Sequence, residues 1–319
     1  MAGGSKPRVL LVDDHRGVLD TVTRMLAGEF EVAAVATSGE EALDAARRVH
    51  PDLIVLDINM PGLNGFQTFR AFEQSGSRAP VVFLSVYDVE EHVSEAFRCG
   101  GRGYVLKSRA ARDLPIALRQ AHLGRRFAPS LSSLWELTGG CGHDLQVHGH
   151  LVRFLDDLAA FFDLALRRGD ATCLIASGEV RDGLSARLRA RGWKVGGPDG
   201  DRRYLAIDAA AAIDRFMRNG LPDATILAAI AAELENYRRS AVERETSRLT
   251  IVGHMAALLM AEGNPAAAVA LESLWHGLTR NLPFYTLCAY GQPCFDTVAS
   301  DFRSRAYAEH DVVSHASGV

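Results

Sequence analysis

Short apolar runs alternate with amphipathic stretches along the first part of the chain. The five apolar runs cover residues 9–14, 31–38, 53–57, 80–85 and 103–107. Continuous runs of this length predict strands that are buried on both faces. The segments between them have helical spacing, as in 39–48, and a further helix is expected at 111–123. The pattern predicts an α/β fold, a (βα)5 doubly wound parallel sheet with helices on both faces.

A second alternation of the same kind follows a segment rich in glycine, serine and proline. It predicts a second α/β domain, of RecA-like character but lacking a Walker A loop. We expect a domain at 1–125, a linker at 126–141, a second domain at 142–313 and a tail at 314–319. Predicted strands of the second domain are 171–177, 203–208, 248–252 and 284–290, and predicted helices are 150–168, 179–191, 209–219, 223–245 and 296–308.

Polar residues gather where the strands of the first domain end. They are Asp13, Asp14, Asp57, Ser85 and Lys107. The carboxyl ends of parallel strands meet at one edge of a sheet, where ligands bind. Phosphoryl transfer to a carboxylate needs a nucleophile, a divalent cation and donors for the phosphoryl oxygens. Asp57 is the candidate acceptor, Ser85 and Lys107 are the candidate donors, and Asp13, Asp14, Asp57 and the backbone carbonyl of Asn59 are candidate Mg²⁺ ligands.

These motifs closely resemble those of response-regulator receiver domains over about residues 7–128. The matching segments are Val12-Asp-Asp-His15, Leu56-Asp-Ile-Asn-Met-Pro-Gly62, Leu84-Ser85 and Gly103-Tyr-Val-Leu-Lys107. The resemblance implies that Asp57 is phosphorylated by a sensor histidine kinase or a phosphotransfer protein, and that Tyr104 is a switch residue. It also implies a homodimer formed through the fourth and fifth receiver helices. Ser108 departs from the family, which commonly has proline after the lysine.

Polar residues also occur on otherwise apolar elements of the second half. Those that could line a ligand pocket are His143, His254, Glu262, Glu272, Trp275, Tyr290 and His310. Buried ionisable groups need partners, so we expect His310 to pair with Glu262 or Glu272. Cys141, His143, His148 and His150 do not have the spacing of a closed zinc site, and a solvated loop is the preferred interpretation of that segment.

This half resembles the MEDS sensory domain of methanogen and methylotroph regulators over about 142–313. Matching segments are 142–143 with Gln146, 205–209, 216–220, 222–223, 253–255, 258–264, 271–275, 287–290, Phe295 and 309–310. The resemblance implies a sensing module for a small-molecule ligand or a downstream protein. His254, Val147-His148 and His276 depart from the usual residues of the family, which indicates a different ligand or a pocket that no longer binds one.

Composition narrows the function further. The net charge is −4 and no basic helix is evident, so DNA binding is disfavoured. We find no secretory core and no apolar stretch long enough to span a membrane, which predicts a soluble, cytoplasmic protein without a membrane partner. The cysteines number five and include no C-x-x-C pair, so we expect reduced thiols that act mostly as buried apolar side chains.

The sequence therefore predicts a two-component response regulator, a phosphoprotein of a phosphorelay, whose receiver controls a MEDS-like domain. We expect no enzymatic activity beyond phosphorylation and dephosphorylation of the receiver itself. Two alternatives stay open. One is a phospho-controlled transcriptional regulator, and the other is an enzyme that uses Glu262, Glu272 or His254 as acid or base.

Overall fold

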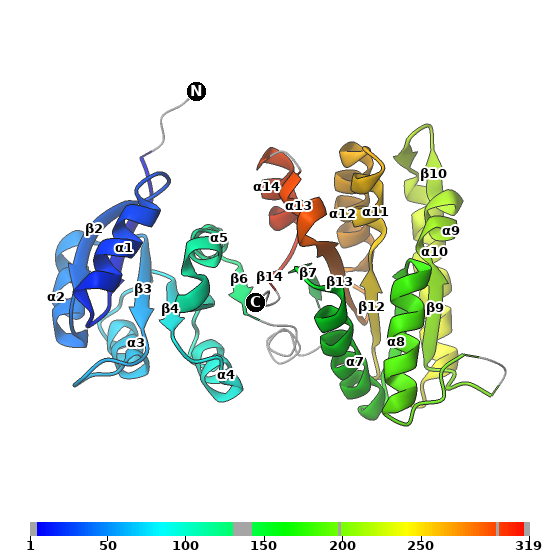
Figure 1. Ribbon diagram of the computed structural model, residues 1–319, viewed down its shortest axis with the longest axis horizontal. Coiled ribbons are helices and arrows are strands. Elements are labelled where there is room, and N and C mark those ends of the chain that lie inside the picture. The colour runs from blue at the N-terminus through cyan, green and yellow to red at the C-terminus, as the bar shows by residue number, and fades with distance from the viewer. Residues whose placement is uncertain (1–4, 130–141, 197–198, 298–299, 316–319) are drawn as a thin grey trace. The chain divides into compact units, whose positions relative to one another are not determined.

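The computed structural model describes residues 5–129, 142–196, 199–297 and 300–315 (Figure 1). The chain divides into two compact units, Met1–Pro129 and Ser130–Val319. Both are α/β units built on a parallel sheet, which confirms the predicted fold class. Within the described ranges, no helix is both long enough and apolar enough to cross a membrane.

The first unit has a parallel sheet with the strand order β2, β1, β3, β4, β5, β6. Strands β1, β3, β4 and β5 are buried almost throughout, whereas the edge strand β2 is partly exposed. This is why the inner strands have uninterrupted apolar sequences. The strands are β1 (Arg8–Val12), β2 (Glu31–Ala36), β3 (Leu53–Asp57), β4 (Val81–Ser85), β5 (Gly103–Leu106) and β6 (Arg126–Ala128).

Helices connect these strands and cover the sheet. Helix α1 contacts α5, and α2 contacts α3. Helix α3 begins with a capping box, in which Asn64 accepts a hydrogen bond from the backbone of Gln67 and the Gln67 side chain accepts one from the backbone of Asn64. The helical segments are α1 (Arg16–Leu26), α2 (Gly39–Val49), α3 (Gly65–Gln74), α4 (Glu90–Arg98), the 3₁₀ turn η1 (Lys107–Arg109) and α5 (Ala110–His122).

Strand β6 lies inside the segment predicted to be a linker. It pairs in parallel with β5 through Gly103 and Phe127, and the Phe127 side chain is fully buried. A strand this short carries no periodic signal in the sequence, so it was predicted as linker. Residues 130–141 of the predicted linker lie outside the described residues.

The second unit has a parallel sheet with the strand order β14, β7, β13, β12, β8, β9. Helix α7 contacts α8, while α9, α10, α11 and α12 contact one another in a second group. A short antiparallel hairpin joins α9 to α10. The strands are β7 (Gly142–His148), β8 (Ala171–Ala176), β9 (Tyr204–Asp208), β10 (Met217–Arg218), β11 (Leu221–Pro222), β12 (Leu249–Gly253), β13 (Phe284–Gly291) and β14 (Val312–His315).

Helices α11 and α12 are separated by a boundary just before Pro265. Helix α11 ends before Gly263, which has a positive φ of 79°, and Asn264 caps α12 by accepting a hydrogen bond from the backbone of Ala267. The helices are α7 (Leu151–Arg167), α8 (Gly178–Ala190), α9 (Ala209–Phe216), α10 (Ala224–Ala241), α11 (Met255–Ala261), α12 (Pro265–Thr279), α13 (Gln292–Thr297) and α14 (Ser300–Ala308).

Two strands of the parallel sheet, β7 and β14, were not predicted, nor was the short hairpin of β10 and β11. The segment of β7 was predicted as a solvated loop, but His143 and His148 are buried and β7 lies between β13 and β14 in the sheet. Strand β14 runs into the segment predicted as a tail. Only Leu145 and Val147 of β7 are apolar, so this strand lacks the continuous apolar run by which the other inner strands are recognised. Cys141 lies outside the described residues, and His150 is exposed.

The missed strand β7 also changes which turn could carry a phosphate-binding loop. The first strand-to-helix turn of this unit is His148-Gly149-His150, and the turn after β8 is the second. Neither turn has a Walker A sequence.

Candidate functional site

The first candidate site is an acidic group at the carboxyl edge of the first sheet. Asp57 is the last residue of β3, and Asp13 and Asp14 follow directly after β1. Strands β1 and β3 are neighbours in parallel, so these carboxylates come together. The side chains of Asp13 and Asp57 are each 2% exposed, whereas that of Asp14 is 23% exposed.

Lys107 joins two of these carboxylates. It follows β5, and its Nζ lies 2.6 Å from Oδ2 of Asp13 and 2.8 Å from Oδ2 of Asp57. Burial alone would lower the pKa of Lys107, but the two carboxylates outweigh it and the pKa is raised. The site therefore holds a positive charge beside Asp13 and Asp57.

Backbone groups of neighbouring residues contact Asp57. The amide of Asn59 donates to Oδ1 of Asp57 at 3.3 Å. Gly65 packs so closely that a Cβ there would lie 2.4 Å from the carbonyl oxygen of Asp57. Burial raises the pKa of Asp57, and Lys107 opposes this only in part. A divalent cation would offset that burial, because it favours the ionised carboxylate.

The donors present fit Mg²⁺. Asp13, Asp14 and Asp57 offer carboxylate oxygens, the ligand type that this hard cation prefers. Donor atoms of Asp13, Asp14 and His15 lie within 4.8 Å of one another. His15, which the sequence did not single out, has its Nδ1 2.7 Å from Oδ1 of Asp14 and so orients that carboxylate.

Ser85 and Tyr104 are linked through the loop that follows β4. Oγ of buried Ser85 accepts a hydrogen bond from the amide of Tyr87 at 3.1 Å. The Tyr104 side chain is fully buried, and its hydroxyl donates to the carbonyl oxygen of Tyr87 at 2.7 Å. The ring of Tyr87 is itself exposed. One loop thus connects the serine hydroxyl with the predicted switch tyrosine.

In the second unit, four of the predicted pocket residues converge. They are His143, Glu272, Tyr290 and His310. Oε2 of Glu272 lies 3.2 Å from Nε2 of His143 and 3.4 Å from Nε2 of His310, and its Oε1 accepts a hydrogen bond from the Tyr290 hydroxyl. The pairing expected for His310 is therefore made with Glu272.

Glu272 and His310 form a buried ion pair, and His143 and Tyr290 contact the same carboxylate. Burial alone would raise the pKa of Glu272, but His310 and His143 outweigh it and hold the pKa well below its usual range. Burial would lower the pKa of His310, yet Glu272 raises it. For His143, burial and the charge of His310 lower the pKa. The negative charge of Glu272 is thus balanced mainly by His310.

Of the other predicted pocket residues, Trp275 lines a small cavity together with Glu272 and Cys288, whereas Glu262 and His254 lie apart from Glu272. Glu262 is exposed at the end of α11 and does not converge with Glu272, contrary to what an acid–base pair would require. Trp275 packs in the core and donates its Nε1–H to Oγ1 of Thr286 at 3.2 Å. His254 lies in a separate aromatic group with His148 and Phe154. Burial lowers the pKa of His254 to about 3 and of His148 to about 4.

Sequence reasoning missed two buried polar groups beside these residues. Cys288, interpreted as an apolar side chain, has its Sγ 3.2 Å from Nε2 of His143. Asp144 accepts hydrogen bonds from the Tyr285 hydroxyl at 2.9 Å and the Val312 amide at 3.1 Å, and burial raises its pKa to about 8. Their alternation with apolar residues along β7 and β13 was the one available signal.

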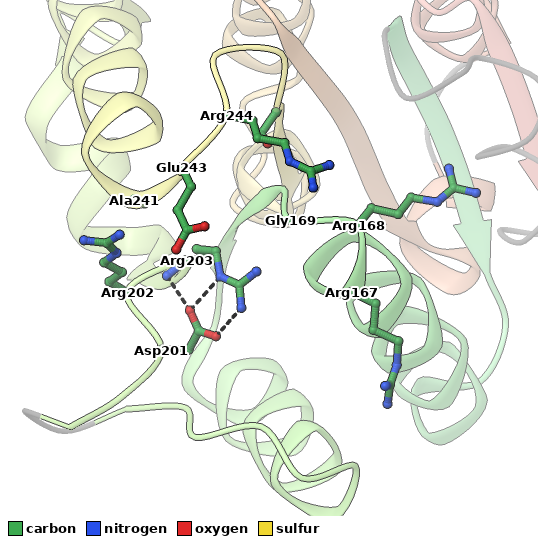
Figure 2. Close-up of a pocket in the computed structure, with 10 residues that line it drawn as sticks. Arg167, Arg168, Gly169, Asp201, Arg202, Arg203, Ala241, Glu243 and Arg244 are labelled. Carbon is green, nitrogen blue, oxygen red and sulfur yellow. Dashed lines mark hydrogen bonds and ion pairs between the residues drawn. The ribbon is translucent and has the colours of Figure 1, made fainter.

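Figure 2 shows a separate pocket of about 340 Å³ at the amino ends of β8, β9 and β12. Asp201 binds Arg203 through both carboxylate oxygens, which restrains that arginine within the pocket (Figure 2). None of the predicted ligand residues is among the described residues that line it. The described residues that line this pocket are Arg167, Arg168, Gly169, Asp201, Arg202, Arg203, Ala241, Glu243, Arg244 and Ser247.

Comparison with known families confirms both resemblances. The model of the response regulator receiver domain matches residues 9–119, and that of the MEDS domain, described as the methanogen/methylotroph DcmR sensory domain, matches 142–310.

Similar curated proteins are response regulators. The nitrate/nitrite response regulator protein NarL of Escherichia coli K12 is 36% identical over 126 residues, 39% of this chain and 58% of NarL. Response regulator GacA of Pseudomonas viridiflava is 34% identical over 122 residues, 38% of this chain and 57% of GacA. The chain thus spans little more than half the length of these relatives. A solved receiver domain of Mycobacterium tuberculosis NarL is 30% identical, with a TM-score of 0.37 over 38% of this chain and all of that one.

Proposed function

The chain belongs to the MEDS family, whose model covers more than half of its 319 residues, and on that premise we propose a two-component response regulator in which a receiver controls this sensory domain. Asp57 is the proposed phospho-acceptor. The proposed donor is a sensor histidine kinase or a phosphotransfer protein. The MEDS domain then acts on a small-molecule ligand or a downstream protein.

The observation that carries this proposal is the position of Lys107 between Asp13 and Asp57. In the reaction, a carboxylate oxygen of Asp57 bonds to phosphorus while the bond from phosphorus to the donor's leaving group breaks. Lys107 and Ser85 bind the phosphoryl oxygens as they separate from the donor. Bound Mg²⁺ would neutralise charge on those oxygens, and Asp13, Asp14, Asp57 and the backbone carbonyl of Asn59 are its proposed ligands.

Transmission of the signal is proposed to run through the loop after β4. A phosphoryl group on Asp57 adds nearly two negative charges, and Ser85 is the hydroxyl that can turn toward them. Rotation of Ser85 removes the hydrogen-bond acceptor of the Tyr87 amide. The carbonyl oxygen of Tyr87 accepts the hydrogen bond from the hydroxyl of Tyr104. Loss of the first hydrogen bond thereby loosens the second, which biases the packing of Tyr104.

The test uses the purified full chain, acetyl phosphate and Mg²⁺, with native mass spectrometry as the readout. We expect one added phosphoryl group on the wild type and none on D57N. The matched control is D20N, which changes an exposed aspartate on α1 and should be phosphorylated like the wild type. A phosphoryl group that persists in D57N would reject Asp57 as the acceptor.

The effect on the second domain is read in the same spectra. We expect phosphorylation to change the oligomeric state or the occupancy of a retained ligand, and D57N to show neither change. Phosphorylation without any such change would retain the acceptor assignment but reject control of the MEDS domain by phosphorylation.

A further inference from the structure

Four potential metal ligands meet within the MEDS domain, apart from the phosphorylation site. His143 comes from β7, Glu272 from α12, Cys288 from β13, and His310 lies between α14 and β14. One donor atom from each lies within 4.8 Å of the others, and all four side chains are buried. The four residues are far apart in the sequence, so no short metal-binding motif indicated that they form a cluster.

The spacing of the donor atoms suits a small ion. Nε2 of His143 lies 3.2 Å from both Oε2 of Glu272 and Sγ of Cys288, and Sγ lies 3.1 Å from Oε2. Nε2 of His310 lies 3.4 Å from the same carboxylate oxygen. In a tetrahedral zinc site with bonds of about 2.0–2.3 Å, neighbouring ligand atoms are about 3.3–3.8 Å apart. These four distances are within a few tenths of an ångström of that range, and the donor atoms of the two remaining pairs are at most 4.8 Å apart.

Hydrogen bonds outside the cluster orient two of the donors, His310 and Glu272, toward its centre. Nδ1 of His310 lies 2.5 Å from the carbonyl oxygen of Ala306, so the opposite nitrogen faces the cluster, and there it makes no hydrogen bond. Tyr290 donates to Oε1 of Glu272, which leaves Oε2 for the cluster. Histidine and carboxylate metal ligands are held in this manner by the groups behind them.

The protein alone leaves this cluster poorly satisfied. Oε2 of Glu272 is the common neighbour of Cys288, His143 and His310, while the cluster-facing nitrogen of His310 has no hydrogen-bond partner. A bound cation would give every one of these atoms a partner at once. It would do so inside a protein interior, where an unsatisfied polar atom is costly.

We infer that His143, Glu272, Cys288 and His310 form a binding site for one divalent transition-metal ion. Two imidazoles, a thiolate and a carboxylate are the donor types used by Zn²⁺ and by ions of similar softness, and the thiolate disfavours Mg²⁺. The site lies outside the proposed phosphorylation reaction and does not depend on it.

A small cavity adjoins the cluster. It measures about 20 Å³ and is lined by Glu272 and Cys288 together with apolar residues such as Met255 and Leu271. About 10–15 Å³ is enough for one water molecule. The cavity can therefore admit a water-sized ligand next to the ion, whereas larger molecules are excluded in this conformation.

The test is titration of the chelator-treated full chain with Co²⁺, followed by Zn²⁺. We expect one Co²⁺ to bind with a near-ultraviolet thiolate-to-cobalt band, and one equivalent of Zn²⁺ to abolish that band. The phosphorylation site contains no thiol, so Co²⁺ bound there cannot produce this band. Titration of D57N therefore gives the same band, and failure of one proposal is distinguishable from failure of the other.

Matched variants identify the ligands. C288S should lose the thiolate band, whereas C294S, which changes a partly buried cysteine of the same domain, should keep it. H310Q should weaken Zn²⁺ binding at least tenfold, whereas H276Q, which changes a neighbouring histidine outside the donor set, should not.

The proposal is overturned if the wild type, folded by circular dichroism, shows no thiolate band with Co²⁺, or if the band survives in C288S. The wild-type spectrum decides the matter even if a variant does not fold. A band that is lost in C294S instead would place the bound ion at a different cysteine and reject this site.

Discussion

The proposed phosphorylation site of the receiver and the buried cluster of the MEDS domain have similar chemistry in different surroundings. Each sets carboxylates against nitrogen bases beside a parallel sheet. In the receiver, the side chains of Lys107 and Asp14 are 17% and 23% exposed. In the MEDS domain, those of His143, Glu272 and His310 are at most 3% exposed. Solvent and partners reach the first site and are excluded from the second.

This difference predicts where substitutions are felt. The Lys107 side chain reaches solvent, so its removal admits water to Asp13 and Asp57, which are each 2% exposed beside it, and the main effect there falls on phosphorylation. In the buried cluster no water compensates, and the main effect falls on the free energy of unfolding. Each prediction below tests this contrast, beginning with the largest expected effect.

Glu272→Ala should destabilise the MEDS domain by about 3–5 kcal/mol, because it leaves His310 buried without its anionic partner. The measurement is urea unfolding of chelator-treated protein, so that the loss reports the side chains alone. Glu262→Ala is the control, since it removes the same side chain from an exposed position and should cost less than about 0.5 kcal/mol. Equal losses of unfolding free energy in Glu272→Ala and Glu262→Ala would contradict the predicted effect of burial.

Lys107→Ala should slow phosphorylation by acetyl phosphate about 10²–10³-fold, because it removes a preorganised cation from the reacting oxygens. The initial rate of phosphoryl incorporation measures this effect. Lys6→Ala, at an exposed lysine of the same unit, should react at the wild-type rate. If Lys107→Ala instead destabilised the receiver as much as Glu272→Ala destabilises the MEDS domain, the edge site would have to be regarded as a core element.

Asp144→Asn should make the stability of the MEDS domain less dependent on pH. The pKa of Asp144 is raised to about 8, so between about pH 4 and 8 the folded state holds a proton that the unfolded state loses. The wild type therefore loses stability as pH rises through this window, by at most about 1.4 kcal/mol per unit from this group.

The measurement is the urea midpoint from pH 5 to 8, with Asp214→Asn on the exposed face of α9 as the control. His310, whose pKa is also raised, leaves a smaller decrease of stability with rising pH in Asp144→Asn. Tyr285 and Asp311 are the other titratable groups that face the carboxyl group of Asp144. An unchanged slope in Asp144→Asn would show that this carboxyl group is ionised in the folded protein.

Tyr104→Phe should have the smallest effect, a loss of about 1 kcal/mol in the stability of the receiver. It removes the hydrogen bond from the hydroxyl to the Tyr87 carbonyl and leaves the ring in place. Phosphorylation should continue at the wild-type rate, because the hydroxyl does not contact Asp57. Tyr87→Phe is the control, since that ring is exposed. A lower phosphorylation rate in Tyr104→Phe alone would make the tyrosine part of the reacting site.

The same contrast explains what the sequence could predict. The strands of the first unit are apolar and buried on both faces, and Asp13 and Asp57 stand at strand ends, where the sheet topology alone brings them together. Cys288, in contrast, meets His143 through the pairing of β13 with β7, and both meet Glu272 of α12 through tertiary packing. No local spacing encodes that meeting. Strand β7 was missed because its buried side chains are largely polar.

Strand β7 has one more consequence, for the accuracy of sheet assembly. Its successive residues face different layers: His143 meets Glu272 of α12, whereas Asp144 meets Tyr285, whose ring contacts Phe161 of α7. A slip of one residue would exchange these faces, bringing Asp144 next to Glu272 without a cation between them. Two buried carboxylates in contact are strongly unfavourable. Polar complementarity therefore favours one register for β7 between β13 and β14.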